Sequence, residues 1–476
     1  MKIGLDFGTT NSVVSFWDEK SQEPRVFNFN NNSYIPSILA WDNISENVYG
    51  IGIEARNKWD NNPKRYNLLQ TFKTLLPHKE RSHWESKGWN SDKSPEEITK
   101  RFIEWLLLSS SGSLAKDRKE KISNIVVSVP QYWQKEKVNN GAEILQRVLN
   151  ELNLPLQQLV SEPLAAVAYY IWKANLKENV EKRILVFDMG GGTFDVSWCI
   201  ATRNKIEVIK NEGNDEDLAG MFHLREIIRN ALKRQGRELR EEDAEFKKYV
   251  WRLENFICGD KEQEDLEKRF RRFRKSPEKY DNEVETLNGF PIYSGDVFNA
   301  YVKIQEGIQE VINSLDREVS DLNSFDQILL VGGFSKYFLV RKTILDYFKL
   351  REDDERVSVV SKSEGYLAIA HGAALLAANQ VKIIEKYPHT ISYHANLKNK
   401  EPVTLIIIEA NHNIKGKKRF FAKEPVRVER KKFTLEGNIF INGDKSKVHK
   451  ISKPISLQNI ELKDDLVFRV GIEINK

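Results

Sequence analysis

The sequence predicts an α/β protein with two duplicated sheet-plus-helix lobes, a helical insertion in the second lobe, and a small β domain at the end. Three observations predict this fold class. A short glycine-rich phrase occurs twice. Apolar strand runs alternate with helix-like stretches in the region that holds the two copies, and the tail carries strand patterns without a long helix. At 476 residues the chain is long enough for two to four domains, each with its own core.

The repeated phrase reads DFGTTN at residues 6–11 and DMGGGTFD at residues 188–195. Each copy follows an apolar run and precedes another, which is typical of a strand, a tight turn and a second strand. Bare backbone N–H groups in such a turn can close around phosphate oxygens. Two facing hairpins would clamp a polyphosphate from both sides, and Asp6 and Asp188 would supply one carboxylate each for a divalent cation.

The first lobe, residues 1–178, is expected to alternate strands and helices. After the first hairpin, the apolar run Ile122–Val129 predicts a strand, and Gln134–Leu152 predicts a helix. A second helix is predicted over Glu162–Trp172, where Pro163 suits the first turn. This alternation predicts parallel strands behind the hairpins.

The second lobe, residues 179–380, contains the predicted helical insertion at residues 216–290. The insertion has dense mixed charge with apolar residues at helical spacing, and no strand run before residues 290–293. The elements expected after it are a strand over Gln327–Val331 that leads into Gly332-Gly333, a helix over Tyr337–Phe348, and a small-residue helix over Gly365–Asn379.

The tail, residues 385–476, predicts a small antiparallel β domain without a helical lid. Val403–Ile408 is an apolar run, and residues 466–475 alternate apolar and polar positions, which indicates a half-buried strand. Turn-like breaks are expected at Gly437-Asn438 and at residues 442–444.

Composition and charge exclude several classes of function. The net charge is only +5, from 74 basic and 69 acidic residues, and acidic residues precede the basic run at 268–275, so nucleic acid is not the expected partner. No apolar run is long enough to span a bilayer, and a strand pattern that starts at Ile3 leaves no room for a leader.

The eight histidines lack ligand spacing, so structural zinc is not expected. Cys199 and Cys258 are expected to be buried and inert, and a reduced, cytoplasmic location is favoured.

The order and spacing of the motifs resemble those of the seventy-kilodalton heat-shock chaperone ATPases, within the actin and sugar-kinase superfamily. The resemblance implies a two-lobed actin-like ATPase fold with ATP and Mg²⁺ in the cleft. It also implies slow hydrolysis that switches the angle between the lobes. It covers roughly residues 1–379, and five segments carry it: residues 3–12, 126–133, 161–166 (SEPLAA), 188–196 and 330–335 (LVGGFS).

Carried over by position, the resemblance implies a role for each site residue. Asp6 and Asp188 would hold Mg²⁺ through its water shell, because Mg²⁺ dehydrates reluctantly. The residues expected to act in catalysis are Lys73, Glu162, Thr193 and Asp195: the lysine neutralises charge on the transferred phosphoryl group, Thr193 lies near it, and the two carboxylates orient or deprotonate the attacking water. The residues expected to contact ATP or ADP are Gly8, Thr9, Thr10, Asn11, Gly190, Gly191, Gly192, Thr193, Gly220, Gly332 and Gly333.

The adenosine side departs from the family pattern. Gly333 leads into FSKYF at residues 334–338, and Lys336 stands where an arginine usually lies along the base. The family's nucleotide-clamping helix best matches residues 267–272, so Glu267 and Arg271 are the contacts expected there. The tail is too short for both a full peptide-binding β domain and a helical lid, which indicates a divergent, lidless relative. The resemblance also implies a protein client or a co-chaperone-like partner.

Two other functions remain open from the sequence. One is an actin-like filament-forming ATPase, which light scattering after ATP addition would reveal. The other is a nucleotide-binding scaffold without turnover, which the altered adenosine side makes plausible.

Overall fold

The computed structural model describes most of the chain in two compact units, Met1–Lys382 and Ile383–Lys476. In the first unit, the described residues are 1–29, 31–108, 121–134, 141–177, 180–214, 218–241, 243–259, 262–319, 322–351, 353–359 and 366–382. In the second they are 383–387, 390–396, 403–408, 412–413, 419–422, 426–428, 433–444, 447–450, 455–460, 466–468 and 471–473.

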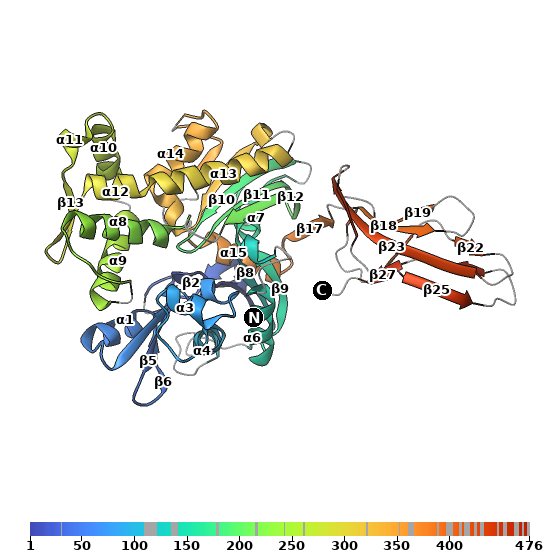
Figure 1. Ribbon diagram of the computed structural model, residues 1–476, viewed down its shortest axis with the longest axis horizontal. Coiled ribbons are helices and arrows are strands. Elements are labelled where there is room, and N and C mark those ends of the chain that lie inside the picture. Colours follow the sequence, from blue (N-terminus) through green and yellow to red (C-terminus); the bar gives the residue numbers. More distant parts are fainter. Residues whose placement is uncertain are drawn as a thin grey trace. The chain divides into compact units, whose positions relative to one another are not determined.

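The first lobe is built on a mixed sheet in the order β3-β2-β1-β8-β9, with β4 paired to β2 (Figure 1). β1 and β2 form the antiparallel first hairpin, while β8 and β9 run parallel to β1, as the alternation of strands and helices predicted. The strands are β1 (Lys2–Asp6), β2 (Asn11–Asp18), β3 (Glu23–Val26), β4 (Ile35–Pro36), β8 (Asn124–Val129) and β9 (Leu156–Ser161).

A second, three-stranded sheet and several helices complete the first lobe. The sheet has the order β6-β5-β7. The predicted helix over Gln134–Leu152 begins at Gly141 among the described residues, because residues 135–140 lie outside them. The elements are β5 (Ile38–Asp42), β6 (Asn47–Ile51), β7 (Tyr66–Gln70), α1 (Gly52–Asn61), α2 (Phe72–Leu75), α3 (Arg81–Ser86), α4 (Pro95–Leu107), the 3₁₀ turn η1 (Gln131–Gln134) and α6 (Gly141–Glu151).

The second lobe repeats the plan of the first. β10 and β11 form the second antiparallel hairpin, and β15 lies parallel to β10 on its other side. The strand predicted over Gln327–Val331 is β15, with the same bounds. The sheet runs in the order β16-β15-β10-β11-β12: β16 (Val357–Val359), β15 (Gln327–Val331), β10 (Lys182–Met189), β11 (Phe194–Thr202) and β12 (Lys205–Asn214).

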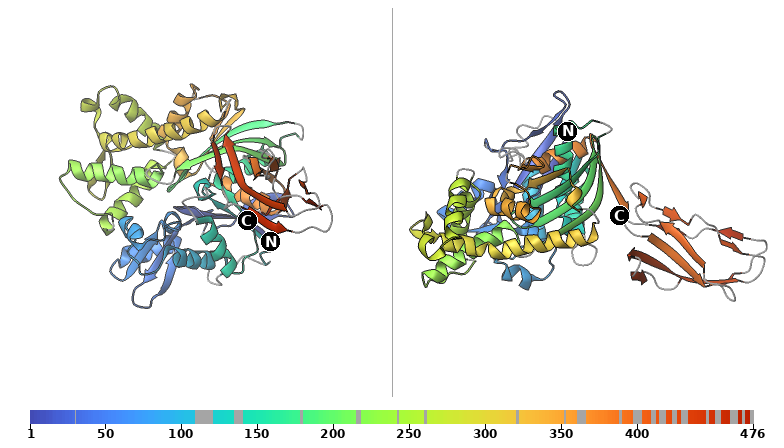
Figure 2. Two further views of the ribbon diagram at one scale, coloured as in Figure 1. Left: turned by 45° about the vertical axis from the view of Figure 1, so that its right-hand side comes forward. Right: turned by 90° about the horizontal axis from the view of Figure 1, so that it is seen from above.

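The insertion is helical, as predicted, and its helices between residues 220 and 280 gather at one side of the second lobe in all views (Figure 2). The prediction that no strand precedes Phe290 is wrong, because β13 pairs with β14 across the turn Asn288-Gly289. Both turn residues have positive φ, and only Leu287 of β13 is buried, so the strand lacks an apolar run. The elements are α8 (Gly220–Arg234), α9 (Ala244–Ile257), α10 (Gln263–Phe273), α11 (Pro277–Tyr280), β13 (Glu283–Leu287), β14 (Phe290–Tyr293), α12 (Ser294–Ala300) and α13 (Val302–Glu318).

Two helices join the lobes, α7 (Glu162–Lys173) and α15 (Ala368–Ala377). They cross so closely that a Cβ on Gly372 would lie 1.7 Å from the Ala165 carbonyl oxygen. α15 also packs on β1, where a Cβ on Gly4 would lie 2.2 Å from the Ala374 nitrogen, while α7 contacts β10 and β11 of the second lobe. Small residues therefore bring both sheets onto one helix pair.

The remaining elements of the second lobe are η2 (Leu322–Ser324), η3 (Gly333–Lys336) and α14 (Phe338–Tyr347). The small-residue helix predicted over Gly365–Asn379 is α15, although Gly365 lies outside the described residues. None of the helices that the structure describes is both long and apolar enough to cross a membrane.

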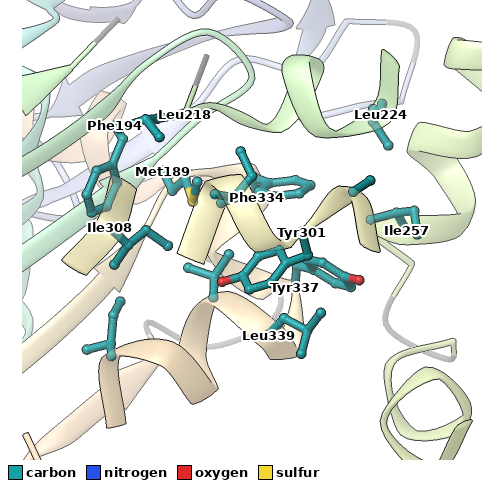
Figure 3. Packing of buried hydrophobic residues seen from close by; sticks show 14 of the residues in the cluster. Met189, Phe194, Leu218, Leu224, Ile257, Tyr301, Ile308, Phe334, Tyr337 and Leu339 are labelled. Carbon is teal, nitrogen blue, oxygen red and sulfur yellow. The ribbon is translucent and has the colours of Figure 1, made fainter. Parts of the chain in front are cut away.

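The core of the second lobe explains the unusual sequence after Gly333. Phe334 and Tyr337 are 3% and 0% exposed, and their rings pack with Tyr301 in an aromatic cluster (Figure 3). The ring of His223 lies in the same cluster, with its centroid 5.3 Å from that of Tyr337. The departure from the family pattern therefore fills the core beneath the glycines.

Buried histidines predict an acid-sensitive fold. Burial lowers the pKa of His223 to about 3 and that of His371 to about 4. Both pKa values lie below the usual 6.5, so the folded state disfavours protonation of these histidines. The stability that each neutral histidine contributes is therefore fully present above pH 6.5 and is lost as the pH falls toward 4. At pH 5 the contribution of each histidine to the free energy of unfolding should be about 2 kcal/mol lower than at pH 7. Urea unfolding of the full chain at both pH values measures this, and His371→Gln should make the stability lost between pH 7 and pH 5 smaller by about 2 kcal/mol. The same loss in His371→Gln as in the wild type would contradict the assignment.

The second unit is a β structure in its described residues. Its largest sheet has the order β19-β18-β23-β24, with β25 also on β23. The break predicted at Gly437-Asn438 is wrong, because both residues lie inside β23 and pair with β18. The alternating run at 466–475 contains β26 and β27, with residues 469–470 and 474–475 outside the described set. The strands are β17 (Lys382–Tyr387), β18 (Thr390–Asn396), β19 (Val403–Ile408), β20 (His412–Asn413), β21 (Arg419–Phe421), β22 (Val426–Val428), β23 (Phe433–Asp444), β24 (Lys447–Lys450), β25 (Ile455–Ile460), β26 (Leu466–Phe468) and β27 (Gly471–Glu473).

Candidate functional site

The tips of the two hairpins are held in the same way. In the first hairpin, the carbonyl oxygens of Gly8 and Thr10 accept hydrogen bonds from the Oγ and N–H of Ser37, at 2.7 and 2.8 Å. In the second, the carbonyl oxygens of Gly190 and Gly191 accept from the N–H groups of residues 220 and 221, at 3.1 and 2.8 Å. Each turn is thus oriented by a neighbouring segment, and the sequence repeat did not reveal Ser37.

A cavity of about 530 Å³ lies against both hairpins. It is large enough for a nucleotide-sized ligand. Its wall brings together these predicted site residues: Asp6, Gly8, Thr9, Thr10, Asn11, Lys73, Glu162, Asp188, Gly190, Gly191, Thr193, Gly220, Gly332 and Gly333.

The two predicted metal ligands, Asp6 and Asp188, stand at the ends of equivalent strands and are 8% and 3% exposed. Burial, reinforced by the negative charge of Glu162, raises the pKa of Asp6 to about 7, although Lys73 and a 3.0 Å hydrogen bond from Ser128 oppose the shift. Burial also raises the pKa of Asp188, and Glu162, Asp195 and Asp6 add to it. The fold therefore concentrates negative charge here at a cost that a cation would relieve.

Lys73 is the buried cation of the site. It is 2% exposed and forms an ion pair with Glu162, the first residue of α7. The residue immediately before α2, which carries Lys73, is Thr71, and its φ of 58° is unusual for a β-branched residue. Strained backbone of this kind is more frequent at functional sites than elsewhere. The ion pair joins two distant segments at the cavity wall.

Asp195 and Gly192, which were expected beside the phosphates, lie off the cavity wall. Asp195 is fully buried in β11, where it faces Asp188 across the hairpin pairing, and it forms no part of the wall. Gly192 packs against the first hairpin instead, since a Cβ there would lie 2.6 Å from Thr9 Oγ1 and Thr74 Cγ2. The hairpin tips therefore touch beside the cavity.

The glycines on the adenosine side are closely packed. Gly332 has a φ of 83°, and a Cβ there would lie 2.4 Å from Asp188 Oδ1. A Cβ on Gly220 would lie 2.7 Å from the Phe334 ring, whereas Gly333 faces open space. The side chain of Lys336 lies outside the described part of the structure.

The prediction that Glu267 and Arg271 line the cavity is wrong. They pair with each other along α10, and the Arg271 side chain is 64% exposed. Phe270 explains the orientation, because its ring packs on Phe298 and Phe338 in the lobe core and so turns that face of α10 inward. The helix on the cavity wall is α9, which contributes Trp251, Glu254 and Asn255 and is followed there by Cys258 and Gly259.

Side chains from the two lobes meet at the cavity wall. The Arg56 guanidinium of α1 lies 4.0 Å from the centroid of a Trp251 ring in α9. Burial lowers the pKa of Arg56 to about 10, while Glu254 opposes that shift. Nearby, Lys248 of α9 forms a 2.6 Å ion pair with Asp60 of α1. No local motif marks these residues, because they meet only through the packing of the two lobes.

The expectation that both cysteines are buried and inert holds only for Cys199. That residue is fully buried, and burial raises the pKa of its thiol to about 12. Cys258 is half-buried and lies on the cavity wall, so it can report whether the cavity is filled.

The donor set fits a magnesium–nucleotide ligand. Asp188 Oδ2 is buried without a hydrogen-bond partner among the described residues, so it has a lone pair available for a cation or its water shell. In the described part of the chain, no group of three His, Cys, Asp or Glu residues could hold a metal ion by itself. The glycines of both turns leave backbone exposed to the cavity wall, which suits phosphate oxygens.

Comparisons with known proteins agree with the geometry. A family model described as "Hsp70 protein" matches residues 2–383. The chain is 27% identical over 417 residues to heat shock cognate 70 kDa protein 3 of Dictyostelium discoideum, which covers 79% of this chain and 60% of that protein. It is 27% identical over 347 residues to chaperone protein DnaK of Mycoplasma mycoides subsp. mycoides SC, which covers 72% of this chain and 54% of that protein. The chain therefore spans less than two thirds of the length of these relatives.

Proposed function

Since this chain belongs to the Hsp70 protein family, we propose that it binds ATP with Mg²⁺ in the cavity beside its hairpins and hydrolyses it slowly as a chaperone-type switch. The family has the two-lobed, actin-like ATPase fold, so that prediction from the sequence is confirmed. One observation supports the activity above all others. Asp6 and Asp188, from duplicated hairpins, line a single cavity together with Lys73 and Glu162.

The proposed chemistry is phosphoryl transfer to water. Transfer of this kind needs mostly positioning and electrostatic stabilisation. Asp6 and Asp188 would hold Mg²⁺, which when bound neutralises charge on the β- and γ-phosphates. Thr9, Thr10 and the backbone of Gly190 and Gly191 would contact the phosphates, with Thr193 near the γ-phosphate.

Water would be positioned by the carboxylates. Glu162 lies on the cavity wall beside Lys73, so it is placed to orient the attacking water and accept its proton. Asp195 lies behind the wall and would act through its charge on Asp188. As the water oxygen bonds to the γ-phosphorus, the bond to the bridging oxygen breaks and ADP leaves with that electron pair. Lys73 would offset the negative charge that is transferred.

The proposed switch is a change in the angle between the lobes. α7 begins with Glu162 and contacts the second-lobe strands, while it crosses α15 at Ala165 and Gly372. A lobe rotation about this helix pair would therefore change the surroundings of Glu162. A protein client or co-chaperone-like partner would respond to the angle, as the name of the Mycoplasma relative, a chaperone protein, suggests.

The proposal predicts nucleotide binding that depends on magnesium and on Asp188. Wild-type protein should bind ATP saturably with Mg²⁺ and release phosphate slowly, and Asp188→Asn should slow that release about a hundredfold. Isothermal titration and a phosphate-release assay measure both quantities. Asp353→Asn is the matched control, because its side chain is 71% exposed on the surface. Binding that ignores both magnesium and Asp188→Asn would contradict the proposal, and magnesium-dependent binding without release would indicate a scaffold.

Cys258 gives that experiment a second readout. Alkylation of its thiol by a small maleimide should slow when ATP and Mg²⁺ fill the cavity, and Asp188→Asn should weaken the protection. The buried Cys199 should stay unmodified in both states, so peptide mass spectrometry separates the two cysteines. Equal modification of Cys258 with and without saturating nucleotide would place the ligand elsewhere.

A further inference from the structure

A second cavity lies beside the proposed nucleotide cavity. It has a volume of about 90 Å³, several times what one water molecule needs. Thr9 and Gly191 line both cavities, so the second one also reaches the phosphate hairpins. The helix α2 borders both cavities, because it contributes Lys73 to the nucleotide cavity and Thr74 to the second one.

The two cavities differ in charge. The nucleotide cavity carries the carboxylates Asp6, Glu162 and Asp188 around one lysine. In the second cavity, every ionisable residue that the structure places on the wall is basic: His78, His83, Lys87 and Arg225. A small chamber that borders the site of phosphate cleavage and carries only basic groups has the chemistry of an oxyanion site.

The basic groups are arranged on two sides of this chamber. The rings of His78 and His83 stack with centroids 3.8 Å apart. Lys87 is exposed and forms no ion pair within the described residues, whereas Arg225 lies 3.4 Å from Glu241. Lys87 therefore offers an ammonium group that no carboxylate of the described chain already neutralises.

A narrow contact joins Thr9, which lines both cavities, to Gly192 and Thr74, which line only the second. Gly192 packs against Thr9 and Thr74 so tightly that a Cβ would lie 2.6 Å from each side chain. Only small side chains form this contact, and it involves one residue from each hairpin plus one from α2. A movement of the hairpins apart would open it.

We propose that the second cavity binds inorganic phosphate and holds the phosphate that hydrolysis produces. The inference rests on the proposed function for the source of that phosphate: water attacks the γ-phosphorus, ADP leaves with the bridging oxygen, and hydrogen phosphate and a proton are formed. The product then passes between Thr9, Thr74 and Gly192 into the basic chamber. Phosphate in solution occupies the same chamber in the absence of nucleotide.

The first test uses phosphate alone on the full chain. Phosphorus NMR titration should show saturable binding to the wild type, and the double variant His83→Gln/Lys87→Met should weaken it about tenfold. Lys79→Met is the matched control, because Lys79 is exposed on the same segment and lines neither cavity. Equal affinity in both variants would overturn the inference. So would binding that Lys73→Ala abolishes and the double variant retains, because the phosphate would then occupy the nucleotide cavity.

The second test follows the product. In a single turnover, quenched samples give the rate of ATP cleavage and a fluorescent phosphate sensor gives the rate of release. Release should lag behind cleavage in the wild type and in Lys79→Met, and the lag should shorten in the double variant. An unchanged lag in the double variant would contradict the inference. If no cleavage occurs at all, the proposed hydrolysis fails, and the titration with phosphate alone still decides whether the chamber is an anion site.

Discussion

Replacing Lys73 with alanine is expected to slow ATP hydrolysis about a hundredfold while changing nucleotide affinity only a few-fold. Lys73 is buried against Glu162 at the cavity wall, so its charge acts where negative charge develops during transfer. Mg²⁺, the hairpin backbone and the adenosine side would still bind the ground state. Single-turnover hydrolysis and isothermal titration with ATP measure the two effects separately. Equal losses in rate and in affinity would contradict a role in the transition state.

The same substitution has a structural cost that must be separated from catalysis. Removing Lys73 leaves the buried Glu162 carboxylate without its cation, which costs about 3–5 kcal/mol in typical buried pairs. The double variant Lys73→Ala/Glu162→Gln should recover part of that stability, because no unpaired charge remains, yet it should not recover activity. Urea unfolding of both variants tests this. Recovery of hydrolysis in the double variant would show that Lys73 only keeps the site folded.

Gly332→Ala is expected to destabilise the fold and abolish magnesium-dependent nucleotide binding. A side chain at a φ of 83° is strained, and its Cβ would lie 2.4 Å from Asp188 Oδ1 and 2.6 Å from the Met189 carbonyl oxygen. The backbone strain alone costs about 1–3 kcal/mol. The clash would in addition displace the carboxylate proposed to hold Mg²⁺. Urea unfolding and ATP titration with and without magnesium measure the two consequences.

Two other glycines serve as matched controls for Gly332→Ala. Gly289 has a φ of 79° with open space around it, so Gly289→Ala carries the strain without the clash and without any contact to the cavity. Gly333 has open space and an ordinary φ, so Gly333→Ala should leave the unfolding free energy unchanged. The explanation is wrong if Gly332→Ala and Gly289→Ala lower stability equally and both keep magnesium-dependent binding.

Short-range sequence signals were reliable where one segment decides its own structure. β15 and β19 have the bounds that their apolar runs predicted, and α7 begins at Glu162 as expected. The hairpins could be predicted because a glycine-rich turn between two apolar runs is compatible with few structures other than a hairpin. β13 was missed since only one of its residues is buried, and the Asn288-Gly289 turn, rather than hydrophobic pattern, sets its pairing.

The clamp on the adenosine side shows where such signals fail. Residues 267–272 carry the right residue types for a nucleotide clamp. Phe270 packs on the core, however, so the face of α10 that carries it points inward and Arg271 is exposed. α9 supplies Glu254 and Asn255 to the cavity instead. Both helices are charged and amphipathic, so local composition could not show which of them lines the cavity. The aromatic core beneath them determines which face of each helix is buried.

By itself, the sequence determined the two hairpins and the paired carboxylates Asp6 and Asp188, because backbone conformation and residue chemistry are local properties. The catalytic candidates came from the resemblance of its motifs to a known family. Only the tertiary structure decided which groups meet around the site: Ser37 behind the first turn, Glu254 of α9 on the cavity wall, and the basic residues of the second cavity. These groups lie far apart along the chain, and packing between lobes, sheets and helices brings them together. Shared walls depend on the whole core, which no single segment encodes.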